Sequence, residues 1–251
     1  MPKKILVSTG HRPVTAGWLP TNPGGVLTTV HPSEQRIDGP RRWAWLSGIA
    51  GLVANVLLAL FYLLARPFSE VQNGFGWLGT ANDWVIPVQF LAMIPVALAL
   101  GRCLPPSRLV RVSTATAIAA MIAVAALQLS FVAGVMDFDV EVVLVVAAFL
   151  LVYAWVLVVS SVGHRHGTLP RSVTRFGLLL GASFPAALLI TAAVYLVGRG
   201  FGHPLAYAIP GIVLGAMSWL AFPAWPLVLA RTVFGIKPST VNSDREREGV
   251  S

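Results

Sequence analysis

Residues 142–163 read VVLVVAAFLLVYAWVLVVSSVG, a run without a single charged side chain. About 20 apolar residues in a helix are enough to cross the roughly 30 Å hydrocarbon core of a membrane. The composition of the whole chain agrees, because 56% of its residues are hydrophobic and 11% are charged. A soluble domain carries about 25% charged residues, so most of this protein's outer surface must face lipid.

The 251-residue chain contains six charge-free windows of this kind. The last window, 200–230, is longer than one crossing needs and contains Pro210, Pro223 and Pro226, each of which can interrupt a helix. Whether this last span is broken stays open. We predict an all-α fold, a polytopic membrane protein whose six-transmembrane-helix bundle occupies residues 43–235, with spans at 43–65, 84–101, 112–136, 142–163, 176–198 and 206–230.

Both ends of the chain are polar. Residues 1–42 contain several prolines and little apolar periodicity, which predicts a disordered cytoplasmic tail. Residues 236–251 form a second, short polar tail.

Basic residues lie almost entirely on one side of the predicted bundle. Six spans put both termini on the same side, and that side holds 16 of the 18 lysine and arginine residues. The positive-inside rule then places both termini in the cytoplasm. The ratio of 15 arginines to 3 lysines is typical of a GC-rich bacterial genome, so we expect a multi-pass protein of the bacterial cytoplasmic (inner) membrane. The pI of 10.6 does not indicate nucleic acid as a partner, because the charges cluster next to apolar spans.

A few polar residues interrupt the spans and suggest where a site would lie. Asn55 and Tyr153 fall near mid-depth, and Gln89 and Gln128 in the outer third. If the outer helix ends converge, these residues form a polar funnel with an acidic mouth and an amide-lined floor, suited to a cation, a metal or a cationic small molecule. The candidate ligand-binding residues are Asn55, Asp83, Gln89, Gln128, Tyr153 and His203, and the candidate metal ligands are Asp137, Asp139 and Glu141; no catalytic residue is assigned.

Each of these residues also has a structural explanation. Asp83 could cap the start of a helix, where a carboxylate meets free N–H groups. Asp137, Asp139 and Glu141 lie in a turn, which must be polar in any case. The buried amides could bond between helices, at about 1 kcal/mol each.

Small residues recur at four-residue spacing. Gly177 and Gly181 open the fifth span, and Gly211 and Gly215 lie in the sixth. Such pairs let helix backbones approach closely, either inside the bundle or at a dimer face. The single cysteine, Cys103, cannot form an internal disulfide or a thiolate zinc site.

The stretch Leu169-Pro-Arg, followed by Gly177 and Gly181, precedes a final span with Trp219 and Trp225. Together with Asn82-Asp83 at the start of the second span, it resembles uncharacterised six-helix bacterial membrane families of unknown function. The resemblance implies an all-helical membrane fold, no known activity and no site residues.

Three functions are compatible with this pattern. The leading hypothesis is a non-enzymatic membrane protein that binds a lipid, a small ligand or a protein partner, as an accessory subunit of a membrane complex. The second is a transporter or channel for a small or cationic solute through the outer funnel, and the third a membrane enzyme with carboxylates and His203 at the outer face. The expected partners are membrane lipids and other membrane subunits or a second copy of the chain; the cofactor stays unknown.

Overall fold

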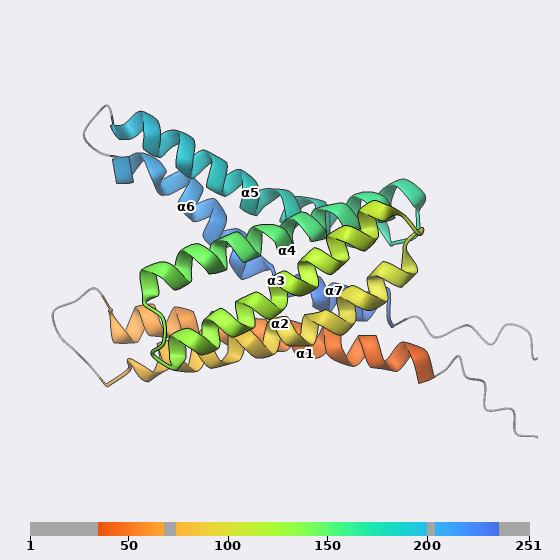
Figure 1. Cartoon of the computed structure of the whole chain (residues 1–251), viewed down its shortest axis with the longest axis horizontal. Helices are drawn as coiled ribbons and strands as arrows, with labels where there is room; N and C mark the ends of the chain where they lie inside the picture. The colour runs from red at the N-terminus through yellow and green to blue at the C-terminus, as the bar shows by residue number, and fades with distance from the viewer. Residues whose placement is uncertain (1–34, 68–73, 200–203, 236–251) are drawn as a thin grey trace, which may run out of the picture. The chain divides into compact units, whose positions relative to one another are not determined.

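The computed structural model describes residues 35–67, 74–199 and 204–235, all of which belong to one compact unit, Ser33–Ser251. Within these ranges the chain is helical and contains no strand (Figure 1). The elements in chain order are α1 (Gln35–Leu60), which continues as the π-helix η1 (Phe61–Ala65), α2 (Trp77–Cys103), α3 (Arg108–Val132), α4 (Phe138–His166), α5 (Arg171–Arg199), α6 (Pro204–Ala221) and α7 (Ala224–Thr232).

Six segments of the described chain are long and apolar enough to cross a membrane: Gly39–Ala65, Trp77–Cys103, Arg108–Val132, Phe138–His166, Arg171–Gly198 and Ile209–Thr232. The prediction of an all-α, six-helix membrane bundle is therefore confirmed. The chain is a multi-pass membrane protein, and the tails at 1–34 and 236–251 lie outside the described residues.

Several helix ends differ from the predicted spans. α1 begins at Gln35 rather than Trp43, and α2 at Trp77 rather than Trp84, because a helix continues past the apolar window into the interfacial region. α3 ends at Val132 rather than Met136, since Gly134 adopts a left-handed conformation with φ of 69°.

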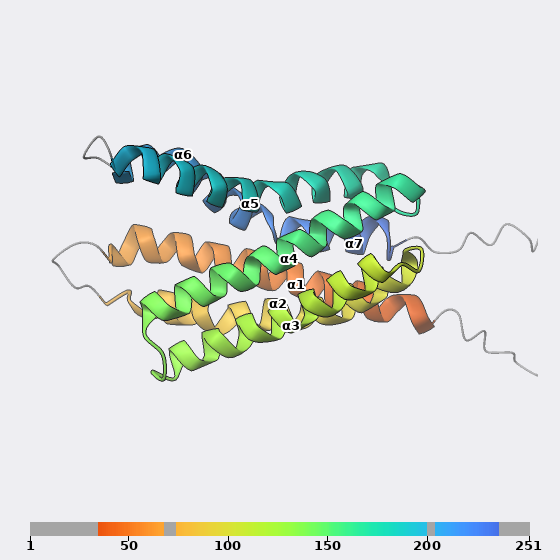
Figure 2. The same cartoon turned by 45° about the horizontal axis from the view of Figure 1, so that its top comes forward.

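Each helix packs against the next in sequence, from α1 to α6, and α7 returns to pack against α1 (Figure 2). The last span thereby closes the ring of helices, but it does so through α7 and not through α6.

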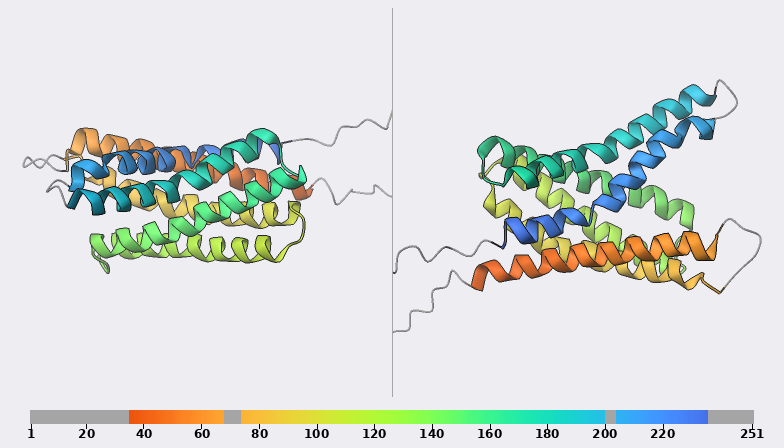
Figure 3. Two further views of the ribbon diagram at one scale, coloured as in Figure 1. Left: turned by 90° about the horizontal axis from the view of Figure 1, so that it is seen from above. Right: turned by 180° about the vertical axis from the view of Figure 1, so that it is seen from behind.

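The last span is broken. α6 ends at Ala221 and α7 begins at Ala224, and the axis changes direction between them (Figure 3). Pro223 and Pro226 have no N–H to donate, so two hydrogen bonds of a continuous helix cannot form here. The two carbonyls that lose their donor four residues later are those of Trp219 and Phe222. They accept instead from the N–H of Phe222 and the N–H of Trp225, respectively, both at 3.1 Å.

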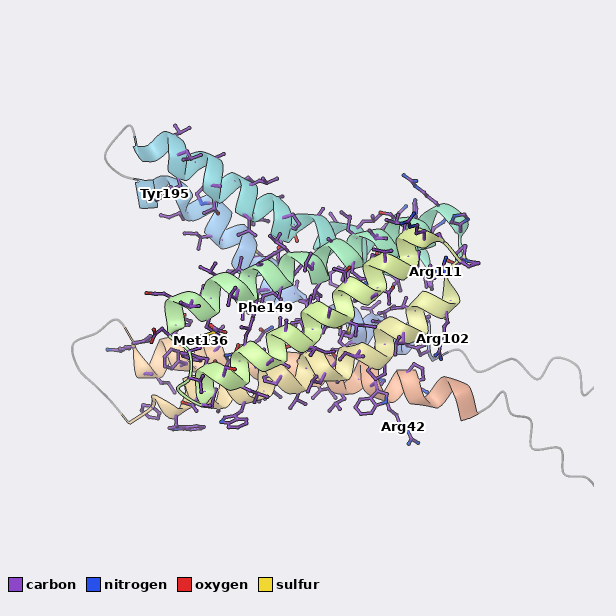
Figure 4. The ribbon with its side chains drawn as sticks, in the orientation of Figure 1. Arg42, Arg102, Arg111, Met136, Phe149 and Tyr195 are labelled. Atoms are coloured by element: carbon purple, nitrogen blue, oxygen red, sulfur yellow. The ribbon has the colours of Figure 1, made fainter. Side chains whose placement is uncertain are left out.

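The two ends of the bundle differ in charge. Figure 4 places Arg42, Arg102 and Arg111 at one end and Met136 at the other. We call the first the basic end and the second, where α4 begins with Asp139 and Glu141 in its first turn, the acidic end. The sequence placed these two carboxylates in a loop, but the helix starts earlier and includes them.

The glycine pairs pack inside the bundle. A Cβ atom at Gly181 of α5 would lie 2.6 Å from the backbone nitrogen of Leu157 in α4. A Cβ atom at Gly211 of α6 would lie 2.7 Å from the backbone nitrogen of Thr191 in α5. Both pairs therefore serve contacts between neighbouring helices of one chain, the first of the two alternatives.

We expect Gly181→Ala to lower the free energy of unfolding by about 1–3 kcal/mol, because the added methyl meets backbone that cannot move aside. The matched control is Gly215→Ala, where the new Cβ would lie 3.6 Å from Ala187, an ordinary contact. That variant should be neutral or up to about 1 kcal/mol more stable through helix propensity. Denaturation in mixed detergent micelles measures both, and equal stability of the two variants would contradict the close α4–α5 contact.

Candidate ligand cavity at the acidic end

A cavity of about 570 Å³ lies at the acidic end, within the range of small-molecule sites. Residues from α1, η1, α2, α3 and α4 line it, and Trp219 of α6 lies at its inner end. We call it the carboxylate cavity; the carboxylates and side-chain amides that line it are Asn82, Asp83, Gln128 and Glu141.

Helix direction explains why these polar groups meet. α2 and α4 both begin at the acidic end, and Asp83 and Glu141 lie near these two starts. A helix N-terminus carries a partial positive charge, which favours a carboxylate there. α3 runs the opposite way, so Gln128 comes near its end and reaches the same level. The sequence prediction that Asp83 and Gln128 face a common space agrees with this placement.

The hydrogen bonding of the cavity is incomplete. The amide of Asn82 donates to the Oδ1 atom of Asp83 at 3.2 Å. Glu141 and Gln128 are each only 5% exposed, and within the described ranges neither side chain has a hydrogen bond or ion pair. Asp83 also interacts electrostatically with Glu141. Burying a carboxylate beside a second carboxylate costs free energy unless a positive charge or hydrogen-bond donors lie nearby. A buried side-chain amide needs hydrogen-bond partners as well.

The three candidate metal ligands do not come together. Asp137 and Asp139 are exposed at the start of α4, while Glu141 is buried in the carboxylate cavity. In the described part of the chain, no three histidine, cysteine, aspartate or glutamate side chains are grouped to hold a metal ion. His203, the remaining candidate at this end, lies outside the described residues.

A second, much smaller space lies deeper in the bundle, which we call the amide pocket. Its volume of about 10 Å³ is close to the minimum for one water molecule. Phe149 and Trp219 line both spaces, and their rings meet edge to face with centroids 4.3 Å apart. Figure 4 shows Phe149 midway along α4. This aromatic pair separates the carboxylate cavity from the amide pocket, which is lined by Asn55, Gln89, Phe90, Phe149, Tyr153, Trp219, Phe222 and Pro223.

Two of the amide-pocket residues bind the broken helix. The amide of Asn55 donates to the carbonyl of Leu220, and the hydroxyl of Tyr153 to the carbonyl of Ser218, both at 3.0 Å. Both acceptors belong to the last turn of α6, next to the break. These contacts show Asn55 and Tyr153 satisfying backbone groups inside the membrane.

The predicted ligand-binding set therefore divides in two. Asp83 and Gln128 line the carboxylate cavity, whereas Asn55, Gln89 and Tyr153 line the amide pocket beneath it. Gln89 was expected with the outer group but lies with the mid-depth group. Glu141, which the sequence suggested as part of the acidic mouth and as a metal ligand, lines the carboxylate cavity.

Sequence reasoning missed three contributors to these spaces. Asn82 is adjacent to Asp83 and was considered only as part of a helix start. Phe149 and Trp219 are apolar residues in apolar spans, and hydropathy contains no signal that separates them from core residues.

Comparisons with protein-family models, with curated proteins and with solved structures each give no match for this chain.

We expect Asn55→Leu to destabilise the protein by about 1 kcal/mol, because the carbonyl of Leu220 loses its side-chain donor in an apolar environment. Tyr153→Phe should cost less, on the order of 0.5 kcal/mol, because the carbonyl of Ser218 keeps the N–H of Phe222. Unfolding in mixed micelles measures both variants. A larger loss for Tyr153→Phe would argue against this account of the break.

Proposed function

We propose that this is a non-enzymatic protein of the bacterial cytoplasmic membrane that binds a small ligand carrying a positive charge in the carboxylate cavity. One observation carries the proposal. Glu141 and Gln128 are almost completely covered, face a cavity large enough for a ligand, and have no partner among the described residues.

The chemistry of the lining supports a cation. Two carboxylates give the cavity a negative potential, and its apolar surroundings strengthen the attraction of a positive charge compared with water. Phe61, Tyr62 and Trp219 also line the cavity, and an aromatic ring whose face meets a cation contributes about 0.5–2 kcal/mol of cation–π attraction. A ligand that brings a positive charge and N–H donors would satisfy Glu141 and Gln128 together.

Binding rather than catalysis is favoured by the kind of groups present. The polar lining consists of carboxylates, amides and one tyrosine, without a serine, cysteine, histidine or lysine among the lining residues. Such a set can orient and neutralise a cation but does not offer the nucleophile and base pair of covalent catalysis.

Neutralising the cavity tests the proposal. We expect the double variant Asp83→Asn with Glu141→Gln to bind the lipophilic cation tetraphenylphosphonium at least tenfold more weakly than the unmodified protein, because both attractive charges are gone. Equilibrium dialysis of the purified protein measures the affinity.

The matched control is the double variant Asp137→Asn with Asp139→Asn. It removes the same net charge at the same end of the bundle, but from exposed side chains outside the cavity. Its affinity should stay within twofold of the unmodified protein. Equal weakening in both double variants would indicate a general charge effect and overturn the assignment of the cavity.

The orientation of the protein is part of the proposal: the basic end faces the cytoplasm, in line with the positive-inside rule. We expect a membrane-impermeant maleimide applied to intact cells to leave Cys103, an exposed residue at the basic end, unlabelled. In a Cys103→Ser background, Val135→Cys should be labelled, because Val135 is 80% exposed at the acidic end. The reverse labelling pattern would invert the orientation.

Transport of a cation through the same cavity is the second candidate function, and the break in the last span favours it. Discontinuous helices are common at the sites of secondary transporters, and here Phe222 and Pro223 of the break line the amide pocket, directly beneath the carboxylate cavity. Uptake of radiolabelled tetraethylammonium into proteoliposomes, abolished by Asp83→Asn with Glu141→Gln, would support transport. If the protein binds the cation but proteoliposomes take up no more of it than protein-free liposomes, the protein binds the cation without transporting it.

A further inference from the structure

The walls of the carboxylate cavity are unequal in polarity. Its carboxylates and side-chain amides come from α2, α3 and α4, as Asn82, Asp83, Gln128 and Glu141. The side formed by α1 and η1 contributes Leu58, Phe61 and Tyr62, and the described part of α6 contributes Trp219 alone. The side toward α1 and α6 therefore carries no carboxylate or side-chain amide, whereas the side formed by α2, α3 and α4 combines these polar groups with apolar residues such as Phe131, Phe138 and Val145.

The same apolar side lacks a helix wall. Toward the acidic end, α6 runs along α5, and the two lean away from α1 (Figures 1 and 3). α1 packs extensively against α7 but not against α6. Next to the break, the amide of Asn55 in α1 donates to the carbonyl of Leu220 in the last turn of α6. Beyond Trp219, toward the acidic end, no described residue of α6 lines the cavity.

The helices beside this opening present apolar side chains. Val56 and Leu60 of α1 and Met217 and Leu220 of α6 are all exposed, at positions within the membrane-spanning segments. Exposed apolar residues at this depth face hydrocarbon chains. On the side toward α1 and α6, the cavity is thus bordered by apolar side chains, and among the described residues α6 contributes only Trp219 to its lining.

We propose that the ligand is a single-chain cationic amphiphile that enters from the membrane between α1 and α6. This inference rests on the proposed function of the carboxylate cavity and adds the class of the ligand and its route. The cationic head contacts Asp83, Glu141 and Gln128 on the polar side. The chain leaves past Leu58 and Trp219 and remains in the hydrocarbon region.

This arrangement satisfies both partners. The buried carboxylate and amide receive a positive charge, while the chain exchanges one apolar environment for another and loses no favourable burial. A small hydrophilic cation would fill the polar side only and leave the apolar side open. An anionic amphiphile would place its negative head group beside the carboxylates of Asp83 and Glu141, and this repulsion is stronger in an apolar environment than in water.

Photo-crosslinking tests the route and the class. The probe is a dodecyltrimethylammonium derivative with a diazirine in the middle of its chain, added to the full-length protein in lipid nanodiscs. We expect mass spectrometry to find adducts on the α1 and α6 sides of the opening, at Leu58, Tyr62 or Trp219. Unlabelled dodecyltrimethylammonium should reduce these adducts at least tenfold, whereas equal concentrations of tetramethylammonium or dodecyl sulfate should reduce them less than twofold.

Two sets of variants decide the outcome. Asp83→Asn with Glu141→Gln should lower cavity labelling at least tenfold, and Asp137→Asn with Asp139→Asn should leave it within twofold. Gln128→Leu, which keeps both charges, should lower it severalfold and serves if the first double variant fails to fold, as judged by its melting temperature.

The possible failures are distinguishable. Equal competition by tetramethylammonium, or adducts confined to other lipid-facing helices, overturns the amphiphile and its lateral route. The binding of tetraphenylphosphonium that supports the proposed function would then still stand. If tetraphenylphosphonium binds the Asp83→Asn with Glu141→Gln variant as tightly as the unmodified protein, the proposed function itself is overturned.

Discussion

Every backbone N–H and C=O group that enters hydrocarbon must find a partner inside the protein, and the last span is where this chain satisfies that constraint least simply. Pro223 and Pro226 remove two donors in the middle of the membrane. Asn55 and Tyr153 supply side-chain donors to the last turn of α6, and Gly51 of α1 lets Pro223 come close. Because the break is satisfied in this way, α7 can close the ring against α1 while α6 takes a different direction with α5. The proposed lateral route into the carboxylate cavity depends on that change of direction.

The electrostatics of the acidic end depend on the same architecture. Helices that alternate in direction bring the N-termini of α2 and α4 to one end, and both carry a carboxylate within their first two turns. The helix dipole favours Glu141, which lies in the first turn of α4, whereas Asp83 lies in the second turn of α2. Glu141 nevertheless has no hydrogen bond or ion pair in the described part of the chain. Stability alone does not require this arrangement, since replacing buried charges by apolar groups of similar volume is often neutral or stabilising. The combination of a cavity with unpartnered polar groups is therefore better explained by a ligand.

The sequence was sufficient to predict the six-helix bundle, and it drew attention to the polar residues of the acidic end, but it did not predict how the cavities there are arranged. Hydropathy sets the number of spans, because each must match the thickness of the membrane, and the rarity of polar residues within spans made Asp83 and Gln128 visible. The division between the carboxylate cavity and the amide pocket depends on how two aromatic rings, Phe149 and Trp219, meet across helices. The position of Gln89 beside Asn55 likewise depends on helix tilt and rotation, which packing decides and hydropathy does not encode. The prolines of the last span indicated that the helix could be broken. The position of the break depends on where side chains such as Asn55 and Tyr153 can donate hydrogen bonds to the backbone.

The short π-helix η1 has a consequence for how the cavity could change during evolution. A π-turn is equivalent to one residue inserted into an α-helix, and here it includes Phe61 and Tyr62, which line the cavity. Deleting one residue in η1 would restore an α-helix and rotate the side chains that follow by about 100°. The contacts of Gly48 and Gly51 with Leu227 and Pro223 lie before this point in the chain, so the inner part of the bundle would be unaffected. A single-codon deletion could thus reshape the rim of the cavity, and with it the range of ligands, while the rest of the fold stayed the same.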